Sequence, residues 1–303
     1  MAASQGLNER SASVWPRWLS ADHPLPWLAP LIAMILAFGI YPLAYAIWLT
    51  MNQQNRFTRK IEFVGGQNWA KALGDERLWN ALTVTFTYTA VCLIVQIALG
   101  MGIALLLDVE RRGYGVLRAL MTLPLVVPPA VTGLMFLLME DAQFGVIAYY
   151  LGLIGLADPT NPILANPMTA LAGVMLADVW QWTPFMVLII LAGLRALPKE
   201  PFEAAAIDGA NALQSFWHLT LPMLGRVLAV AILIRTIDLF RIYDYVYAMT
   251  GGGPGTVTET LSFYAGRAFG VADFSYAATL SLIILIVLNL VCFTFIKLAR
   301  VRF

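Results

Sequence analysis

The chain has 303 residues, of which 60% are hydrophobic and only 12% are charged, and its net charge is +1. A soluble domain has about 25% charged residues, so this composition indicates a membrane protein. The near-zero net charge argues against nucleic acid as a partner. Two histidines and two distant cysteines, Cys92 and Cys292, argue against a metal site and a disulfide framework.

Residues 1–25 are polar and lack the apolar core and the cleavage site of a signal peptide. We therefore expect this segment to stay on the chain as a cytoplasmic N-terminal segment. A single transmembrane domain is expected over residues 26–303.

Six apolar stretches follow, each long enough to cross the hydrocarbon core of a bilayer, which needs about 20 helical residues. They cover residues 27–49, 81–107, 118–139, 169–193, 223–248 and 277–298. The sequence therefore predicts an all-α membrane protein with six transmembrane helices. Pro124, Pro128 and Pro129 predict a kink in the third, because a helix bundle can supply partners for the carbonyls that proline frees.

Lysine and arginine positions predict the orientation, because they are more frequent on the cytoplasmic side. With both termini in the cytoplasm, the cytoplasmic side holds Arg10, Arg17, Arg111, Arg112, Arg118, Arg195, Lys199, Arg226, Lys297, Arg300 and Arg302. The outer side then holds only Arg56, Arg59, Lys60, Lys71, Arg77 and Arg267. Residues 140–168 become an outer loop that faces a periplasmic partner, and Glu140 is expected near the outer interface, where exposure costs little.

The segment 198–222 is polar and lies between the fourth and fifth apolar stretches. Pro201 and Glu203 suit the first turn of a helix, where no amide donor is needed and the dipole favours an acid. The alanines at 204–206 favour a helix and add little bulk, so a partner can approach closely. Gly209 suits a turn with positive φ. We expect a short helix, a glycine turn and a second short helix.

The order Glu-Ala-Ala, Asp-Gly-Ala and Leu-x-Leu-Pro in this segment resembles the EAA loop of permease subunits in binding-protein-dependent ABC importers. The residues that carry it are Glu203, Ala204, Ala205, Asp208, Gly209, Ala210, Leu219, Leu221 and Pro222. An alanine-rich re-entry loop is the alternative, which the full spacing over twenty residues disfavours. The resemblance implies a cytoplasmic coupling loop over residues 198–222 that seats in a groove of an ATPase subunit.

Charged residues in the fifth apolar stretch form a second candidate site. Arg235, Asp238, Arg241 and Tyr245 are expected on one face of a helix, which should look into the bundle or a watery cavity because charges in a membrane span are costly. Two interpretations stay open. Each arginine can pair with an aspartate three residues away in a structural ladder. Alternatively, the face can bind a sugar, with arginine and aspartate holding its hydroxyls and a tyrosine stacking on its ring.

The fourth stretch adds Asp178, Gln181 and Trp182, for which helix packing is a commoner role than ligand binding. Gln181 and Trp182 are nonetheless candidate substrate contacts. The stretch from Arg235 to Asp244 and the loop Thr250–Pro254 are similar to the corresponding segments of sugar permeases, particularly those of the trehalose type. The lead-in from residue 63 resembles that of carbohydrate-class permeases. The chain departs from that pattern at residues 137–139, where the family more often has tryptophan or arginine.

The resemblance implies an inner-membrane permease that imports a sugar, a disaccharide or a glycoside. It implies a second homologous permease, two ATPase subunits that bind ATP and Mg²⁺, and a periplasmic sugar-binding protein. No cofactor is expected in this chain. No lysine is followed by Ser or Thr, so the chain has no phosphate-binding loop and cannot be its own ATPase.

Three other functions remain as alternatives. An ion-coupled secondary transporter would explain buried charges but not the segment 198–222. An ABC permease for a non-sugar polar solute would explain both. An intramembrane enzyme is disfavoured, because the chain lacks the His-Glu-x-x-His and Gly-x-Ser-x-Gly motifs.

Overall fold

The computed structural model describes residues 24–54, 58, 60–109, 112–155, 160 and 162–298. The expected N-terminal segment 1–25 lies almost wholly outside these residues, so its cytoplasmic placement stays a prediction. The same holds for several basic residues used to predict orientation, namely Arg10, Arg17, Arg56, Arg59, Arg111, Arg300 and Arg302.

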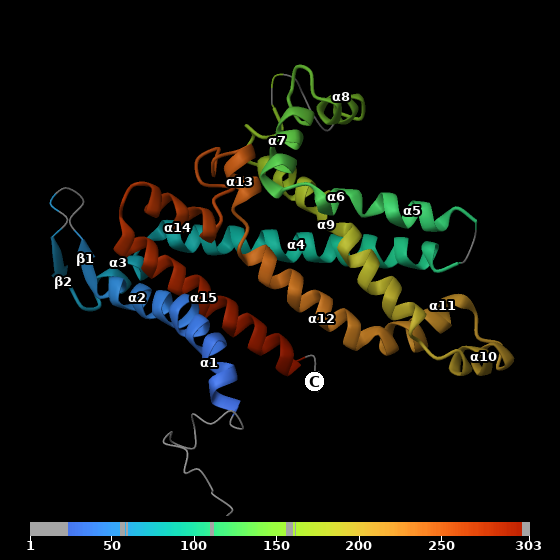
Figure 1. Ribbon diagram of the computed structural model, residues 1–303. Coiled ribbons are helices and arrows are strands. Elements are labelled where there is room, and N and C mark those ends of the chain that lie inside the picture. Colours follow the sequence, from blue (N-terminus) through green and yellow to red (C-terminus); the bar gives the residue numbers. More distant parts are fainter. Residues whose placement is uncertain are drawn as a thin grey trace, which may run out of the picture.

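The described residues form mainly helices (Figure 1). In the first half these are α1 (Pro24–Ile35), the π-helical η2 (Leu36–Ile40), α2 (Tyr41–Thr50), α3 (Gln67–Leu73), α4 (Glu76–Leu107), α5 (Tyr114–Met121), α6 (Leu123–Val126), α7 (Pro129–Met139) and α8 (Val146–Leu153). In the second half they are α9 (Ala170–Arg195), α10 (Glu200–Ile207), α11 (Ala212–Ser215), the π-helical η3 (Phe216–Thr220), α12 (Leu221–Phe240), α13 (Asp244–Met249), α14 (Leu261–Gly270) and α15 (Phe274–Leu298). A short antiparallel hairpin, β1 (Asn52–Gln54) and β2 (Ile61–Phe63), pairs Gln53 with Glu62.

Four helical stretches among the described residues are long and apolar enough to cross a membrane. They are Trp27–Thr50, α4, α9 and α15. A fifth span results if Tyr114–Val126 and Pro129–Met139, bent by 96°, count as one. The composition thus supports a multi-pass membrane protein with four or five spans, whereas the sequence predicts six. The expected span missing from these is α12, whose composition is too polar because it carries the charged residues Arg226, Arg235 and Asp238.

The expected fifth span, 223–248, is not one helix, and this prediction is wrong. Helix α12 ends at Phe240, and α13 begins only at Asp244. The carbonyls of Phe240 and Ile242 leave the helical pattern and accept hydrogen bonds from the hydroxyls of Ser262 (3.1 Å) and Thr260 (2.9 Å). Tertiary partners therefore replace the helix bonds at this break.

The kink in the third span is confirmed and is sharper than a simple bend. Val127 adopts an extended conformation (ψ 131°) before two consecutive prolines. A residue before proline is pushed out of the helical region, and Pro128 and Pro129 have no amide hydrogens to continue the ladder. The chain therefore turns by 96° between α6 and α7.

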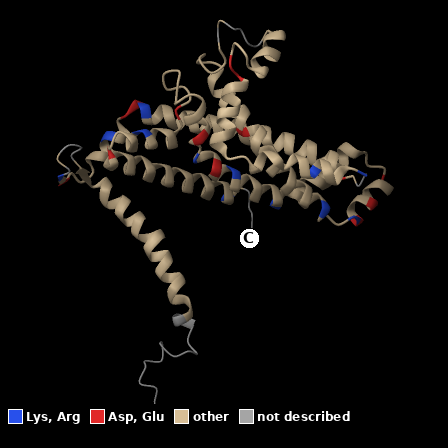
Figure 2. Ribbon diagram, turned by 45° about the horizontal axis from the view of Figure 1, so that its top comes forward, with Lys and Arg blue, Asp and Glu red and all other residues tan. Residues whose placement is uncertain are grey.

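Helices α4 and α9 form the centre of the packing, and α9 crosses α4 in Figure 1. Gly100 permits their close approach, because a Cβ there would lie 2.8 Å from the Cβ of Met186. In the same figure, α10 and α11 lie at one end of the bundle, with the hairpin and α3 at the opposite end. Figure 2 shows charged residues gathered toward the ends, with a small group in the middle of the bundle.

A polar cluster fastens α4, α14 and α15 together at the hairpin end. Asp75 caps α4 and accepts hydrogen bonds from the Arg77 amide (2.9 Å), the Tyr276 hydroxyl (2.6 Å) and the Tyr264 hydroxyl. Burial would raise the pKa of Asp75, but these hydrogen bonds outweigh it and hold the pKa below its ordinary value. Arg77 also binds Glu259 through two bonds of 2.5 and 2.8 Å.

The contact at Gly100 yields a test of the α4–α9 packing. Gly100→Ala should lower the thermal midpoint of the purified protein in detergent, because the new methyl group overpacks against Met186, at a cost of roughly 1–3 kcal/mol. The matched control is Gly102→Ala in the same helix, where nothing lies within 4 Å of the new Cβ. This control should hold or raise the midpoint, since alanine favours a helix over glycine by about 1 kcal/mol. Equal midpoints in the two variants would contradict the packing described here.

Candidate functional site

An ion pair lies in the middle of the bundle, where three helices meet. Arg235 of α12 donates through Nη2 to Oδ1 of Asp178 on α9 (2.6 Å) and through Nε to Oε1 of Gln96 on α4 (3.1 Å). Gln96 Nε2 donates to the same Asp178 oxygen (2.7 Å). We call Gln96, Asp178 and Arg235 the polar centre. Each of the three is about 1% exposed or less.

The polar centre needs all three members because its surroundings are apolar. Removing two charges from water costs several kcal/mol per ion, and close geometry with extra hydrogen bonds is required to offset that cost. The indole ring of Trp182 adds a cation–π contact, with its centre 4.7 Å from the guanidinium carbon of Arg235. The network thus ties α4, α9 and α12 together in one arrangement.

A second chain of hydrogen bonds runs from Trp182 to the proline break. Its indole nitrogen donates to the Tyr245 hydroxyl (3.1 Å), which donates to Oε1 of Gln181 (2.5 Å). Gln181 Nε2 then donates to the carbonyl of Val127 (2.5 Å), which the bend between α6 and α7 has freed. Gln181 therefore supplies the partner that a broken membrane helix requires.

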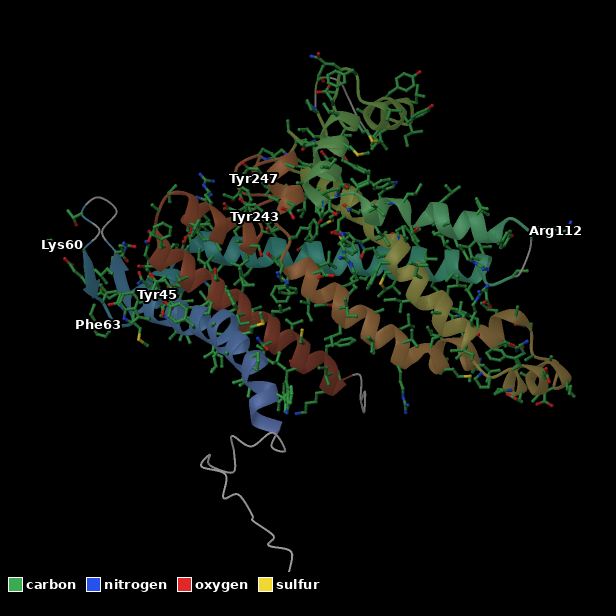
Figure 3. All side chains as sticks on the ribbon, in the orientation of Figure 1. Tyr45, Lys60, Phe63, Arg112, Tyr243 and Tyr247 are labelled. Atoms are coloured by element: carbon green, nitrogen blue, oxygen red, sulfur yellow. The ribbon has the colours of Figure 1, made fainter. Side chains whose placement is uncertain are left out.

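Other polar residues near the polar centre are accessible. Asp238 lies 3.7 Å from the Arg235 guanidinium, and its side chain is 40% exposed. Arg241 follows the end of α12 and is exposed. The ring of Tyr243, the residue before α13, stacks 5.6 Å from the ring of Tyr247 on α13, and Tyr247 is 65% exposed (Figure 3).

The segment 198–222 forms the turn expected from its sequence, and we call it the coupling segment after the role that the sequence resemblance implies. Helix α10 ends at Ile207, and Asp208 follows as its cap. Gly209 has φ +81°, a conformation that a side chain disfavours. Asn211 and Gln214 then form a reciprocal capping box that begins α11.

The coupling segment presents apolar side chains to the outside at its end of the bundle. Ile207 is 86% exposed, Leu213 67% and Trp217 58%. A cavity of about 770 Å³ lies between the segment and the ends of α4 and α9, and Glu203 and Phe202 line it. Exposed apolar residues beside a cavity are typical of a protein-binding surface.

Residues 96–302 match the family of binding-protein-dependent transport system inner membrane components. The chain belongs to this family. Its members are transport permease subunits of ABC importers and not enzymes. The protein is therefore a permease and a multi-pass protein of the inner membrane.

The permease is similar in sequence to two transport permeases and in fold to one solved structure. It is 34% identical over 275 residues to the trehalose/maltose transport system permease protein MalF of Thermococcus litoralis, covering 91% of this chain and 92% of that one. It is 31% identical over 272 residues to the trehalose transport system permease protein SugA of Mycobacterium tuberculosis, covering 89% and 86%. At 20% identity, its fold matches a chain of a bacterial alginate ABC transporter in complex with an alginate pentasaccharide-bound periplasmic protein, with a TM-score of 0.76 over 91% of this chain and 93% of that one.

The structure separates the residues expected on one face of the fifth helix. Arg235 and Tyr245 are each 1% exposed, whereas Asp238 and Arg241 are accessible. Tyr245 belongs to α13, so the periodicity argument that placed it on one helix with Arg235 does not apply. Gln181 is buried as well, and Trp182 is half-buried between Arg235 and Tyr245.

Sequence reasoning missed the principal partner of Arg235. It predicted Asp238, three residues away, but Asp178 is closer and lies on another helix. The sequence does mark Asp178 as a charged residue within an apolar stretch, and this is the one feature that could have suggested it as a partner of Arg235. Pairing across 57 positions requires knowing that α9 and α12 are neighbours. Gln96 gave no signal beyond being a polar residue in an apolar stretch.

The polar centre gives a double-mutant cycle as its test. Asp178→Asn and Arg235→Gln should each lower the yield and thermal midpoint of the permease, because each leaves a buried charge without its partner, at a cost of roughly 3–5 kcal/mol. The double variant should recover much of the loss. Asp238→Asn serves as the control and should change the midpoint little, because this side chain is partly exposed. Additive losses in the double variant would contradict a coupled pair.

Proposed function

We propose that this permease imports a sugar across the inner membrane, a disaccharide or a glycoside, as one subunit of an ABC importer. The coupling segment carries the proposal, because a helix–glycine–helix turn with exposed apolar residues offers another subunit a surface through which motion can be transmitted. Relatives that cover most of the chain are named as trehalose or trehalose/maltose permeases, which supports a sugar as cargo. The import is driven by ATP on a partner chain.

Six spans and a cytoplasmic coupling segment form part of this proposal. Helix α12 is the additional span, fifth in chain order, since Asp178 neutralises its Arg235 and Gln96 hydrogen-bonds it, and since 20 residues suffice to cross a bilayer. The coupling segment then lies in the cytoplasm with both termini. Lys60 and Arg112, which lie at opposite ends of the bundle in Figure 3, fall outside and inside respectively.

The proposed assembly has a second homologous permease, two ATPase subunits and a periplasmic sugar-binding protein. ATP and Mg²⁺ bind to the ATPase subunits. The permease residues proposed to contact the ATPase subunits are those of the EAA-like pattern, namely Glu203, Ala204, Ala205, Asp208, Gly209, Ala210, Leu221 and Pro222. A fold shared with a chain of the alginate transporter, solved with its periplasmic protein, supports this arrangement.

The sugar path is proposed beside the polar centre rather than on it. Arg235 is paired with Asp178. Tyr245 donates its hydroxyl hydrogen to Gln181, which in turn donates to the carbonyl of Val127. Asp238 and Arg241 retain accessible polar groups, which can hold sugar hydroxyls. Trp182 is half-buried at the junction of the two networks. In this proposal, the buried members position the accessible ones.

The coupling segment can be tested with the assembled transporter. Gly209→Val and Glu203→Lys should each reduce sugar-stimulated ATP hydrolysis by at least about tenfold, because one places a β-branched residue at φ +81° and the other reverses a charge at the interface. Gly225→Val is the matched control, since Gly225 lies on the exposed side of α12 with nothing within 4 Å. Full stimulation in both coupling variants, with normal assembly, would refute the proposed role.

Orientation has a separate test. An enzyme reporter that is active only outside the cytoplasm should work when fused after Asn166 and should fail when fused after Asn211. The reason is that the two sites lie on opposite sides of the span formed by α9. The reverse pattern would place the coupling segment outside and remove it from any cytoplasmic ATPase.

A further inference from the structure

Glu140 follows α7 directly and is buried without a partner. Its residue surface is 1% exposed, and neither carboxylate oxygen has a hydrogen-bond partner among the described residues. The carboxylate lies against Gly173 of α9, where a Cβ would collide with it. The expectation that Glu140 is exposed at low cost is therefore wrong. Burial raises the pKa of this carboxyl to about 7.

A buried carboxylate without a partner is rare, because the lost hydration is normally replaced by hydrogen bonds or an opposite charge. The other buried acids in the described part of the chain follow that rule. Asp178 pairs with Arg235, and Glu259 binds Arg77. Glu140 differs from both, because neither a hydrogen bond nor an opposite charge reaches its carboxyl oxygens among the described residues.

A cavity of about 480 Å³ adjoins Glu140. Three segments contribute to its wall: residues 137–143, residues 162–165, and residues 249–254, which comprise the end of α13 and the loop after it. Gln143 and Ala165 on its rim are exposed. Glu140 contributes to the wall, but both of its carboxylate oxygens are buried, so its side chain must turn toward the cavity to meet a group that enters from outside.

None of the described residues that line this cavity is a lysine, arginine or histidine. Between Arg118 and Arg195 the sequence contains no lysine, arginine or histidine but has four acids, Glu140, Asp141, Asp158 and Asp178. Residues 242–266, which include the third wall, contain no basic residue either. Arg77 and Arg267 are both engaged with Glu259. The segments that line the cavity therefore offer Glu140 no cation, and one supplied by another molecule would find an unpaired carboxylate there.

The position of the cavity selects among the proposed subunits. It lies at the end of α7, whereas α10 and α11 lie at the coupling end of the bundle (Figure 1). In the proposed orientation the cavity faces the periplasm and is out of reach of an ATPase. The partner that arrives there repeatedly is the sugar-binding protein.

We propose that the Glu140 cavity is a docking socket for one lysine or arginine side chain of the sugar-binding protein. The proposal rests on the proposed function of the permease as a subunit of a binding-protein-dependent importer. Docking inserts the cation beside the Glu140 carboxylate and converts a costly buried group into a paired one. Asp141 does not take this role, because its Oδ1 already accepts the backbone amides of Gln143 (2.8 Å) and Phe144 (3.3 Å).

The test uses the assembled transporter in nanodiscs and a sugar-loaded binding protein, measured by its stimulation of ATP hydrolysis. Glu140→Gln keeps the shape of the side chain and removes its charge. It should raise the half-maximal concentration of binding protein by about tenfold and weaken the dependence on ionic strength. Asp141→Asn is the matched control, and its half-maximal concentration should stay within about twofold of wild type.

A second arm identifies the incoming cation. Lysines and arginines on the binding protein are replaced one at a time by glutamine and measured against both permease forms. One replacement should weaken docking to wild type about tenfold and have no further effect on Glu140→Gln, because both changes remove the same pair.

The remaining outcomes are distinguishable. If wild-type transporter shows no stimulation by any binding protein, the proposed function itself fails. If wild type is stimulated and Glu140→Gln has the same half-maximal concentration and the same salt dependence, only the socket is refuted. If Glu140→Gln instead lowers the yield of the assembled complex, with docking unchanged, the cation comes from the second permease and the socket is likewise refuted.

Discussion

The arrangement of the bundle depends on one ion pair that membrane burial makes indispensable. Arg235 and Asp178 come from helices α12 and α9, and neither could remain in an apolar span without the other. Gln96 completes the arrangement from α4. Helix α12 therefore enters the bundle with its charge already compensated. This explains how α12, whose composition is too polar for it to count as a membrane span, packs among helices that are apolar enough to cross a membrane.

The proline break and the polar centre are connected through neighbouring residues of α9. Gln181 satisfies the carbonyl of Val127 that the 96° bend frees, while Trp182 covers Arg235 and donates to Tyr245. Residues within one turn of α9 thus contact the bent third span, helix α13 and Arg235 of the ion pair. A change in the angle between α9 and α12 would have to rearrange all of these contacts together. Such a shared set of contacts is suited to a small number of discrete states.

The sequence predicts local features of this permease well and long-range partners poorly. Gly209 and the helices beside it were predictable because a glycine turn and its caps are determined within a few residues. The bend at Val127 was predictable because proline acts on its neighbours. The end of α12 was not, since hydroxyls of Thr260 and Ser262 stabilise it from twenty residues away. Asp178 as the partner of Arg235 was beyond reach for the same reason.

The central claim is that this chain carries a sugar inward at the expense of ATP on a partner subunit. The most direct measurement is uptake of radiolabelled trehalose or maltose into proteoliposomes that contain the assembled transporter. The binding protein is added outside and ATP is enclosed, and a parallel sample receives a proton or sodium gradient without ATP. Uptake is expected only when ATP and the binding protein are both present. Uptake driven by the ion gradient alone would contradict the central claim.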